Sequence, residues 1–291
     1  MSLSSSRPVW ALLAGASLWG VVWYPYRILA GAGLDGIWST ALTYGIALAV
    51  GAAIFRGELA ALRRAPPLAI VMALAIGWSN LAYVLGVLEG EVMRVLLLFY
   101  LAPLWTVPVA RIVLKERLDG AGLAAMALAL AGAAVMLWHP ELGLPWPRAR
   151  SEWLGVLAGF LFAVGNVLVR RLDTMTDAGK SIAIWAGVTF AGLVHLPASG
   201  VAPGAAFAAA GVEWSVVAGV GMALVAMSLS LQYGLARLPA NRAIVILLFE
   251  LVVAALAAYL LAGESMGPRE WIGGALIVAA TLVSARPGKD A

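Results

Sequence analysis

The chain has 291 residues, of which 63% are hydrophobic and only 12% are charged. A soluble domain has about 45–50% apolar and 25% charged residues, so this composition excludes a soluble globular fold and predicts a protein that lies in a lipid bilayer. The net charge of +4 comes from Lys and Arg clusters between apolar runs, which indicates membrane topology rather than a nucleic-acid partner. Cysteine is absent, which excludes disulfides, thiolate metal sites and thiol nucleophiles.

Ten long apolar stretches follow one another along the chain, each close to the ~20 residues that a helix needs to cross a bilayer. The bilayer core offers no water to backbone groups, so each stretch must be a helix or a barrel strand, and these lengths exclude strands. The sequence therefore predicts an all-α integral membrane protein with ten transmembrane helices. They are expected over residues 8–30, 37–56, 66–88, 92–113, 121–138, 152–172, 179–197, 212–235, 242–261 and 269–286.

The first apolar stretch has some features of a secretory signal. Arg7 precedes it, and the Ala-Gly-Ala run at 30–32 offers a small-residue cleavage site. The stretch is too long for the apolar region of a signal peptide, however, and it carries Trp19 and Trp23, which a disposable segment does not require. We therefore expect it to remain as the first transmembrane helix.

The distribution of basic residues predicts the orientation, because cytoplasmic loops are enriched in Lys and Arg. Of the 19 basic residues, five lie on one side of the predicted spans and the other 14 on the opposite side. This split places both termini in the cytoplasm and requires an even number of spans, which ten satisfies. The minority set comprises Arg27, Arg94, Arg148, Arg150 and Arg269.

An internal repeat divides the chain into two related halves. Each half has five spans, an odd number, so the second half must enter the membrane from the opposite side, as in many secondary transporters. We expect a first five-helix repeat over residues 1–138, a periplasmic linker at 139–151 and a second five-helix repeat over 152–291. At an offset of 150, the matching positions are Leu81, Tyr83, Leu88, Phe99 and Leu101 with Leu231, Tyr233, Leu238, Phe249 and Leu251.

Two GxxxG pairs, Gly86 with Gly90 and Gly155 with Gly159, indicate that helices approach closely at these positions. The spacing leaves open whether the close approach lies within the chain or between subunits.

Several short motifs lie along the two halves of the chain. They are Trp19-Gly20 in the first span, Tyr-Leu-Ala-Pro-Leu at 100–104 and Lys-Glu-Arg-Leu at 115–118, and Phe-Glu-Leu-Val at 249–252 followed by Gly263-Glu264. In their order and spacing the chain resembles the drug/metabolite transporter superfamily, specifically its ten-helix, two-repeat branch of EamA-like bacterial metabolite and amino-acid exporters. The resemblance implies a basket-like bundle whose central cavity is lined mainly by spans one, three, four, six, eight and nine.

The chain departs from that family pattern in span nine. Relatives usually have a proline after the glutamate, where this chain has Leu251 and Val252. A helix kink is therefore expected in span four, but no proline supports a kink in span nine. Its aromatic content resembles that of the aromatic amino-acid exporters.

Several aromatic side chains lie far from the predicted span ends. Trp19, Trp23 and Trp78 are deep in their helices, and the first two lie one turn apart, so they could line a pocket for an apolar or aromatic substrate or simply pack or face lipid. Tyr100 lies near the midplane, with Tyr83 on the preceding span. A buried tyrosine needs a partner for its hydroxyl, which a substrate or a neighbouring helix could supply.

Polar groups within the spans complete the predicted site. Amides such as Asn80 and Asn166 either bind a zwitterionic substrate or hydrogen-bond between helices. Glu250 is the only carboxylate that we place near mid-depth, where an isolated charge costs about 2.5–3.5 kcal/mol or more. It must be protonated, paired or facing water, and it either braces span nine or serves as a proton or substrate-amine site. The predicted substrate-binding residues are Trp19, Trp23, Trp78, Asn80, Tyr83, Tyr100, Asn166 and Glu250.

The predicted function is a secondary transporter in the bacterial inner membrane that exports a small metabolite by alternating access, with amino acids and particularly aromatic ones first. Drug-like cations or nucleosides are alternative solutes. An intramembrane enzyme or a non-transporting scaffold is disfavoured, because the sequence contains no nucleophile–base arrangement. No catalytic residue, cofactor or metal is expected. The expected partners are the small-molecule substrate and the lipid bilayer, not nucleic acid, and a monomer is expected to function.

Overall fold

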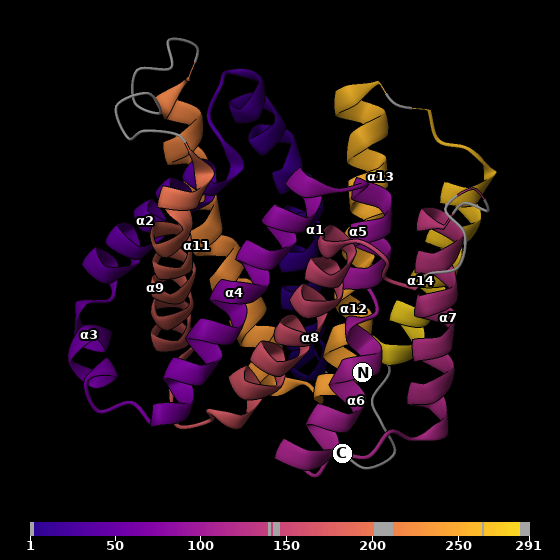
Figure 1. Cartoon of the computed structure of the whole chain (residues 1–291). Coiled ribbons are helices and arrows are strands. Elements are labelled where there is room, and N and C mark those ends of the chain that lie inside the picture. The colour runs from indigo at the N-terminus through magenta and orange to yellow at the C-terminus, as the bar shows by residue number, and fades with distance from the viewer. Residues whose placement is uncertain (1–2, 139–140, 142–145, 201–211, 264, 286–291) are drawn as a thin grey trace.

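The structure, a computed structural model, describes residues 3–138, 141, 146–200, 212–263 and 265–285. This part of the chain contains helices and no strand, so the all-α prediction is confirmed for it (Figure 1). The elements are α1 (Leu3–Gly31), α2 (Gly36–Ile54), α3 (Arg56–Leu62), α4 (Pro67–Glu89), α5 (Val92–Phe99), α6 (Ala102–Val113), α7 (Gly120–Leu137), α8 (Arg150–Arg171), α9 (Asp177–His195), the 3-10 helix η2 (Leu196–Ser199), α11 (Trp214–Arg237), α12 (Ala240–Leu247), α13 (Phe249–Ala262) and α14 (Pro268–Ala285).

Each of the ten predicted stretches overlaps a helix or a pair of helices. The fourth is split into α5 and α6 and the ninth into α12 and α13. The short helix α3 was not predicted, because its charged sequence lies between two long apolar runs and has no apolar stretch of its own. Residues 139–140 and 142–145 of the expected linker lie outside the described residues.

By length and composition, seven of the described helical stretches could cross a membrane, whereas the sequence analysis predicts ten. The other three predicted stretches are the helices α1, α9 and α14. They carry polar or charged residues that lower their mean hydropathy, such as Tyr24 in α1, Lys180 in α9 and Arg269 in α14. The seven stretches are Gly36–Ile54, Pro67–Val87, Val92–Val113, Gly120–Leu137, Arg150–Arg171, Trp214–Arg237 and Ala240–Ala262.

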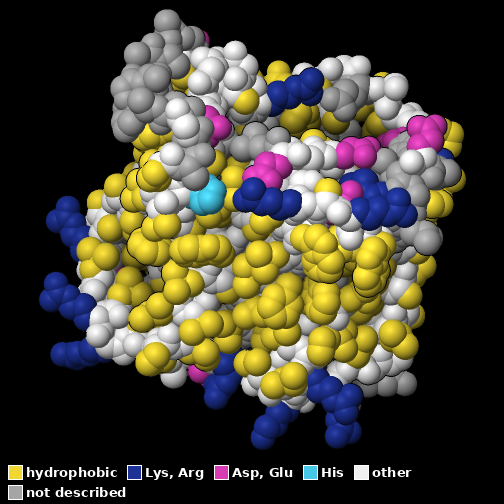
Figure 2. Space-filling model, viewed as in Figure 1, with side chains coloured by type: hydrophobic (Ala, Val, Ile, Leu, Met, Phe, Trp, Pro, Cys, Tyr) yellow, Lys and Arg dark blue, Asp and Glu magenta, His cyan; other side chains and the backbone are white. Residues whose placement is uncertain are grey.

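The surface separates apolar from charged side chains. Figure 2 shows hydrophobic side chains across the middle of one face, Lys and Arg side chains projecting from the lower and left edges, and Asp and Glu side chains gathered in the upper part. Trp10, Trp153 and Trp271 are among the large hydrophobic residues that are exposed. An apolar belt bounded by charged rims is the surface of a membrane protein.

The two split helices break for different local reasons. Pro103 has no backbone N–H, so the carbonyl of Phe99 lacks its usual helical partner and α5 ends there. At the corresponding place in the second half, residues 240–262 contain no proline, yet α12 ends before Leu248. There the Leu248 N–H bonds to the Val245 carbonyl and the Leu251 N–H to the Leu248 carbonyl, which are tighter, three-residue bonds. Span nine is therefore broken without the proline that the family pattern would supply.

Helices of one half pack mainly on helices of the other. The helix α8 packs against α4, α5 and α6, and α1 packs against α11, α12 and α13. The helices α7 and α14 pack against each other, as do α2 and α9. The largest hydrophobic core therefore contains residues from both halves of the chain.

Both GxxxG pairs serve this packing within the chain. Gly155 and Gly159 of α8 lie against the backbone of α5, where a Cβ atom would collide. Gly86 of α4 and Gly90, directly after α4, lie against Ser151 at the start of α8. The close approach that the sequence left open is therefore internal at both pairs.

Candidate functional site: Tyr100 and Glu250 where the two broken helices meet

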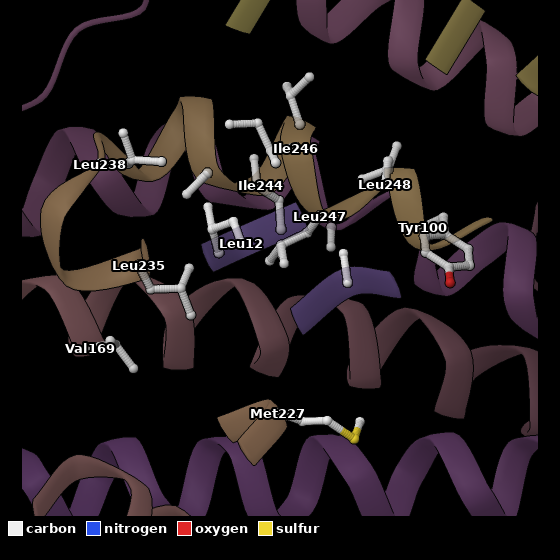
Figure 3. Packing of buried hydrophobic residues seen from close by; sticks show 14 of the residues in the cluster. Leu12, Tyr100, Val169, Met227, Leu235, Leu238, Ile244, Ile246, Leu247 and Leu248 are labelled. Atoms are coloured by element: carbon white, nitrogen blue, oxygen red, sulfur yellow. The ribbon is translucent and has the colours of Figure 1, made fainter. Parts of the chain in front are cut away.

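The two helix breaks bring a phenol and a carboxyl group together. Tyr100 caps the end of α5, and Glu250 lies in the first turn of α13. The Tyr100 Oη donates a hydrogen bond to Glu250 Oε1 at 2.6 Å. In Figure 3, Tyr100 lies beside the junction of α12 and α13 at Leu248. One polar contact therefore joins the broken helix of the first half to that of the second.

The Trp19-Gly20 motif positions α1 against this junction. A Cβ atom at Gly20 would collide with the backbone carbonyl of Glu250 and with Val253, so only glycine allows α1 to approach so closely. Trp19 is partly buried and packs against the main hydrophobic core. Glu250 also lies at a helix N-terminus, where the aligned peptide dipoles favour a negative charge.

Aromatic rings surround the Tyr100 side of the pair. The ring of Phe99 lies 5.3 Å from that of Tyr83, 5.1 Å from that of Tyr100 and 5.4 Å from that of Phe162, measured between centroids. Tyr83 is also within electrostatic range of Glu250. A carboxyl group with neighbouring aromatic faces is the environment that binds an organic ammonium group attached to an apolar body.

Asn80 belongs to a different polar group. Its Nδ2 donates to the Tyr44 Oη at 3.5 Å, and nearby the hydroxyl groups of Tyr26 and Thr43 are 2.6 Å apart. These side chains come from α1, α2 and α4, and no hydrogen bond connects them to Glu250 in the described residues. The Nδ2 contact joins α4 to α2, whereas the buried Asn80 Oδ1 has no hydrogen-bond partner within the described residues.

Two of the predicted tryptophans make their contacts elsewhere. Trp78 packs against Phe190 of α9, with 6.0 Å between ring centroids, and 51% of Phe190 is exposed. Trp23 contacts Tyr24 edge-on at 5.7 Å, and the guanidinium group of Arg27 lies 5.9 Å from its ring. Neither contact involves the Tyr100–Glu250 pair. Depth along a helix, the basis of the prediction, does not determine which face a side chain occupies.

Asn166 lies on the same side of α8 as the aromatic cluster. It is one turn beyond Phe162, whose ring touches Phe99, and it is 6% exposed. Its Nδ2 makes no hydrogen bond within the described residues. An unpaired donor that is this deeply buried is costly unless a ligand or water satisfies it.

A buried ion pair joins the halves at one end of the broken helix. Arg94 of α5 and Glu152 of α8 form a bidentate contact, with Nε–Oε1 at 2.6 Å and Nη2–Oε2 at 3.0 Å. Their side chains are only 9% and 11% exposed. Arg94 also donates to the Trp146 carbonyl, and Glu152 accepts from the Arg148 N–H. The sequence analysis used Arg94 only for topology and missed this pair.

A second ion pair joins the halves at the other end. Glu116, which follows α6, contacts Arg170 of α8 through one carboxylate oxygen. Its other oxygen accepts a hydrogen bond of 2.8 Å from the Ala240 N–H at the start of α12. Tyr100 lies between Arg94 and Glu116 along the chain, so the Tyr100–Glu250 pair is flanked by cross-half ion pairs on both sides.

Metal-binding groups do not gather in the part of the chain that the structure describes. Within it, no three His, Asp or Glu side chains come together in a way that could hold a metal ion. The Tyr100–Glu250 pair combines one ionisable carboxyl group with a phenol, so it can exchange a proton or bind a cation.

Comparison with known proteins finds sequence similarity to transporters. Residues 149–286 match the model of the EamA-like transporter family. A protein of Archaeoglobus fulgidus described as an uncharacterized transporter is 28% identical over 70% of this chain and 71% of its own length. A protein of Streptantibioticus cattleyicolor described as a "probable terminal-alkyne amino-acid exporter" is 28% identical over 96% of this chain and 93% of its own.

The fold is shared with a protein of known crystal structure. That structure has a TM-score of 0.78 and covers 96% of this chain and 97% of its own, with 20% sequence identity. At this identity the likeness extends to the fold alone. The second half of this chain is thus similar in sequence to EamA-like transporters, and the names of both relatives indicate a transporter rather than an enzyme.

Proposed function

We propose that this protein is a secondary transporter of the bacterial inner membrane that exports amino acids, with aromatic ones favoured, by alternating access. The observation that carries the proposal is the hydrogen bond between Tyr100 and Glu250, which joins the two helix breaks. Broken helices whose ends meet at an ionisable group are how many secondary transporters build a substrate site within the bilayer. The relative described as an amino-acid exporter, similar over nearly the whole chain, supports the substrate class.

We further propose ten spans in two inverted five-helix repeats, residues 1–138 and 152–291, with a periplasmic linker at 139–151 and both termini in the cytoplasm. Corresponding hydrogen bonds support this division. The Ser79 Oγ of α4 donates to the Ala158 carbonyl of α8, and the Ser230 Oγ of α11 donates to the Ala11 carbonyl of α1. Helices α5 and α12 begin at 92 and 240, and α7 and α14 at 120 and 268, a difference of 148 in both cases.

Alternating access requires contacts that form on one side of the site while others break. The Arg94–Glu152 and Glu116–Arg170 pairs both cross between the halves, on opposite sides of Tyr100. In the proposed cycle, opening toward the periplasm separates Arg94 from Glu152, and opening toward the cytoplasm separates Glu116 from Arg170. Binding at Glu250 shifts this equilibrium only if the substrate interacts differently with the two states.

The amine of the substrate is proposed to replace the Tyr100 hydroxyl as the partner of Glu250. In the proposed complex the rings of Tyr83, Phe99 and Tyr100 surround the amino group, and Asn166 supplies an unused hydrogen-bond donor. The proposed binding residues also include Trp19, next to the glycine that contacts Glu250. Drug-like cations remain the second candidate, because an organic cation meets the same carboxyl group and aromatic faces.

Flux into proteoliposomes that contain only this protein tests the proposal. Radiolabelled phenylalanine, tryptophan, a nucleoside and a quaternary ammonium cation are each offered at equal concentration. Saturable flux of the two amino acids, absent from empty liposomes, is the expected result. Flux of the cation without flux of the amino acids would support transport of drug-like cations instead. No flux of any of these solutes would rule out their transport by this protein.

The proposed topology can be tested independently, because any introduced cysteine is the only one in the chain. A cysteine at Ala65 is expected to be protected from an impermeant thiol reagent in intact cells, whereas a cysteine at Pro147 is expected to react. Lysed cells provide the control, in which both positions should be labelled. The reverse pattern would overturn the assignment of the termini and the inverted repeat.

A further inference from the structure

An apolar cavity adjoins Tyr100. It has a volume of about 180 Å³ and lies between the α5–α6 junction and α7. Its lining residues are Leu97, Tyr100, Leu101, Leu130, Ala133, Ala134 and Trp138.

The walls of the cavity select an apolar occupant. Apart from the Tyr100 hydroxyl and the Trp138 indole nitrogen, the lining side chains are hydrocarbon. A polar group placed here would lose its hydrogen bonds to water without gaining new ones, which costs about 1–3 kcal/mol for each group. An aliphatic or aromatic group meets no such penalty.

The size of the cavity limits the occupant to one side chain. At about 30 Å³ for each water in the liquid, its volume corresponds to about six waters. Pockets that enclose whole drug-sized molecules have volumes of roughly 300–1,000 Å³. A cavity of 180 Å³ therefore suits part of a small molecule rather than a whole drug.

Tyr100 connects the cavity to the carboxyl group. The same side chain lines the cavity and donates a hydrogen bond to Glu250. A molecule whose amine is bound at Glu250 would thus have its remaining part close to Tyr100, which is one wall of the cavity. Trp138, which is 38% exposed, lies at the end of α7, and its carbonyl accepts a hydrogen bond from Arg269 of α14. That hydrogen bond holds the backbone of Trp138, which is one of the residues lining the cavity.

We infer that this cavity receives the apolar side chain of the exported amino acid while the amino group is bound at Glu250, so that it determines which amino acids are transported. The inference rests on the proposed function. It assigns selectivity to α7, a helix that the sequence analysis did not include among those lining the central cavity. Small residues at 133 and 134 leave the space that a large side chain occupies, and Leu130 limits it.

Two substitutions of opposite effect test the inference in proteoliposomes. Ala134→Phe fills the cavity and is expected to lower phenylalanine and tryptophan flux about tenfold relative to alanine flux, since pocket contacts of this size discriminate by roughly 10- to 200-fold. Leu130→Ala enlarges it and is expected to raise the ratio of tryptophan to leucine flux about threefold. Ala131→Phe is the matched control, because Ala131 is exposed on the same helix and does not line the cavity.

The readout is a ratio between substrates, so a general loss of folded protein does not imitate the expected result. Equal reductions for all amino acids in Ala134→Phe, or the same ratios as in Ala131→Phe, would overturn the inference while wild-type flux still supports the proposed function. Unchanged ratios together with a new dependence of flux on lipid acyl-chain length would mean that a lipid chain occupies the cavity, which also overturns it. A wild-type protein that transports no amino acid contradicts the proposed function itself.

Discussion

The two broken helices reach the same geometry by different means. Between α5 and α6 a proline removes a backbone donor, whereas α12 and α13 separate at Leu248 with ordinary residues only. The glycines of α8 lie against the first break, and Gly20 of α1 lies against the second. The shared element is the close approach of a helix from the other half. A helix that packs through glycine therefore contacts both breaks, whereas a proline is present at only one of them.

The two breaks also differ in the group that each contributes. The first supplies Tyr100, a hydrogen-bond donor that stays neutral in ordinary conditions, and the second supplies Glu250, which can carry a charge. If the proposed function holds, the carboxyl group binds the substrate and the phenol holds the carboxyl group when no substrate is present.

The largest effect is expected from Glu250→Gln, which keeps the size of the side chain but removes its ability to ionise. Hydrogen bonds to charged groups contribute about 1.5–3 kcal/mol, so amino-acid flux should fall about 10- to 100-fold at normal expression. The residual flux should lose its dependence on pH. Flux and a pH profile equal to those of the wild type would leave Glu250 as a packing residue.

A smaller effect is expected from Tyr100→Phe, which removes the hydroxyl and keeps the ring. A neutral donor contributes about 0.5–1.5 kcal/mol, which corresponds to a change of about 2- to 12-fold in flux. Tyr83→Phe serves as the matched control, since Tyr83 makes no hydrogen bond to Glu250. A larger loss in Tyr83→Phe than in Tyr100→Phe would contradict the role assigned to the first break.

Pro103→Ala examines the cause of the first break. The substitution restores one backbone donor, but the packing of α8 remains and the second break needs no proline. We expect flux to fall by no more than about fivefold, which corresponds to the ~1 kcal/mol that one net hydrogen bond contributes. Pro108→Ala, within α6, is the control for loss of a proline in the same helix. Complete loss of flux in Pro103→Ala alone would show that the proline, not the packing, maintains the break.

Trp78→Ala should have the smallest effect, because Trp78 packs against the half-exposed Phe190 and belongs to neither break. A change within about 0.5 kcal/mol corresponds to roughly a twofold difference in flux. The exposed Trp271 provides a baseline through Trp271→Ala. A loss in Trp78→Ala that matches Glu250→Gln would place Trp78 in the substrate path and restore the expectation drawn from the sequence.

Much of the fold could be predicted from the sequence, because each long apolar run predicts a helix. The helix breaks could be predicted only in part. Pro103 predicts the first break locally. The break at Leu248 lies against α1, which is more than 200 residues away in the sequence, so no local pattern predicts it. The short helix α3 was missed because charged, surface helices have no long apolar run. The hydropathy of α1, α9 and α14 is lowered by residues near their ends.

The site was harder to predict, because depth in the bilayer does not give the direction of a side chain. Depth drew attention to Tyr83, Tyr100 and Glu250, and these three lie near one another. The same reasoning also selected Trp78 and Trp23, whose contacts lie elsewhere. Phenylalanines such as Phe99 carry no polar signal, so nothing in the sequence distinguished them from lipid-facing residues. Pairing Arg94 with Glu152 required the contact between α5 and α8.

The contact of Gly20 with Glu250 has a consequence for the synthesis of the chain. The helix α1 leaves the ribosome 230 residues before its partner, the difference between 250 and 20. At a synthesis rate of about 5–20 residues per second, roughly 12–46 seconds pass before the surface on which α1 packs has been made. Gly159, which packs on the carbonyl of Phe99, is made 60 residues after it, or about 3–12 seconds later. The first break can therefore be packed early in synthesis, whereas Gly20 of α1 cannot contact α13 until that helix is made. Nascent chains arrested before residue 250 should accordingly expose the Gly20 face of α1 to a lipid-soluble crosslinker, and full-length chains should not.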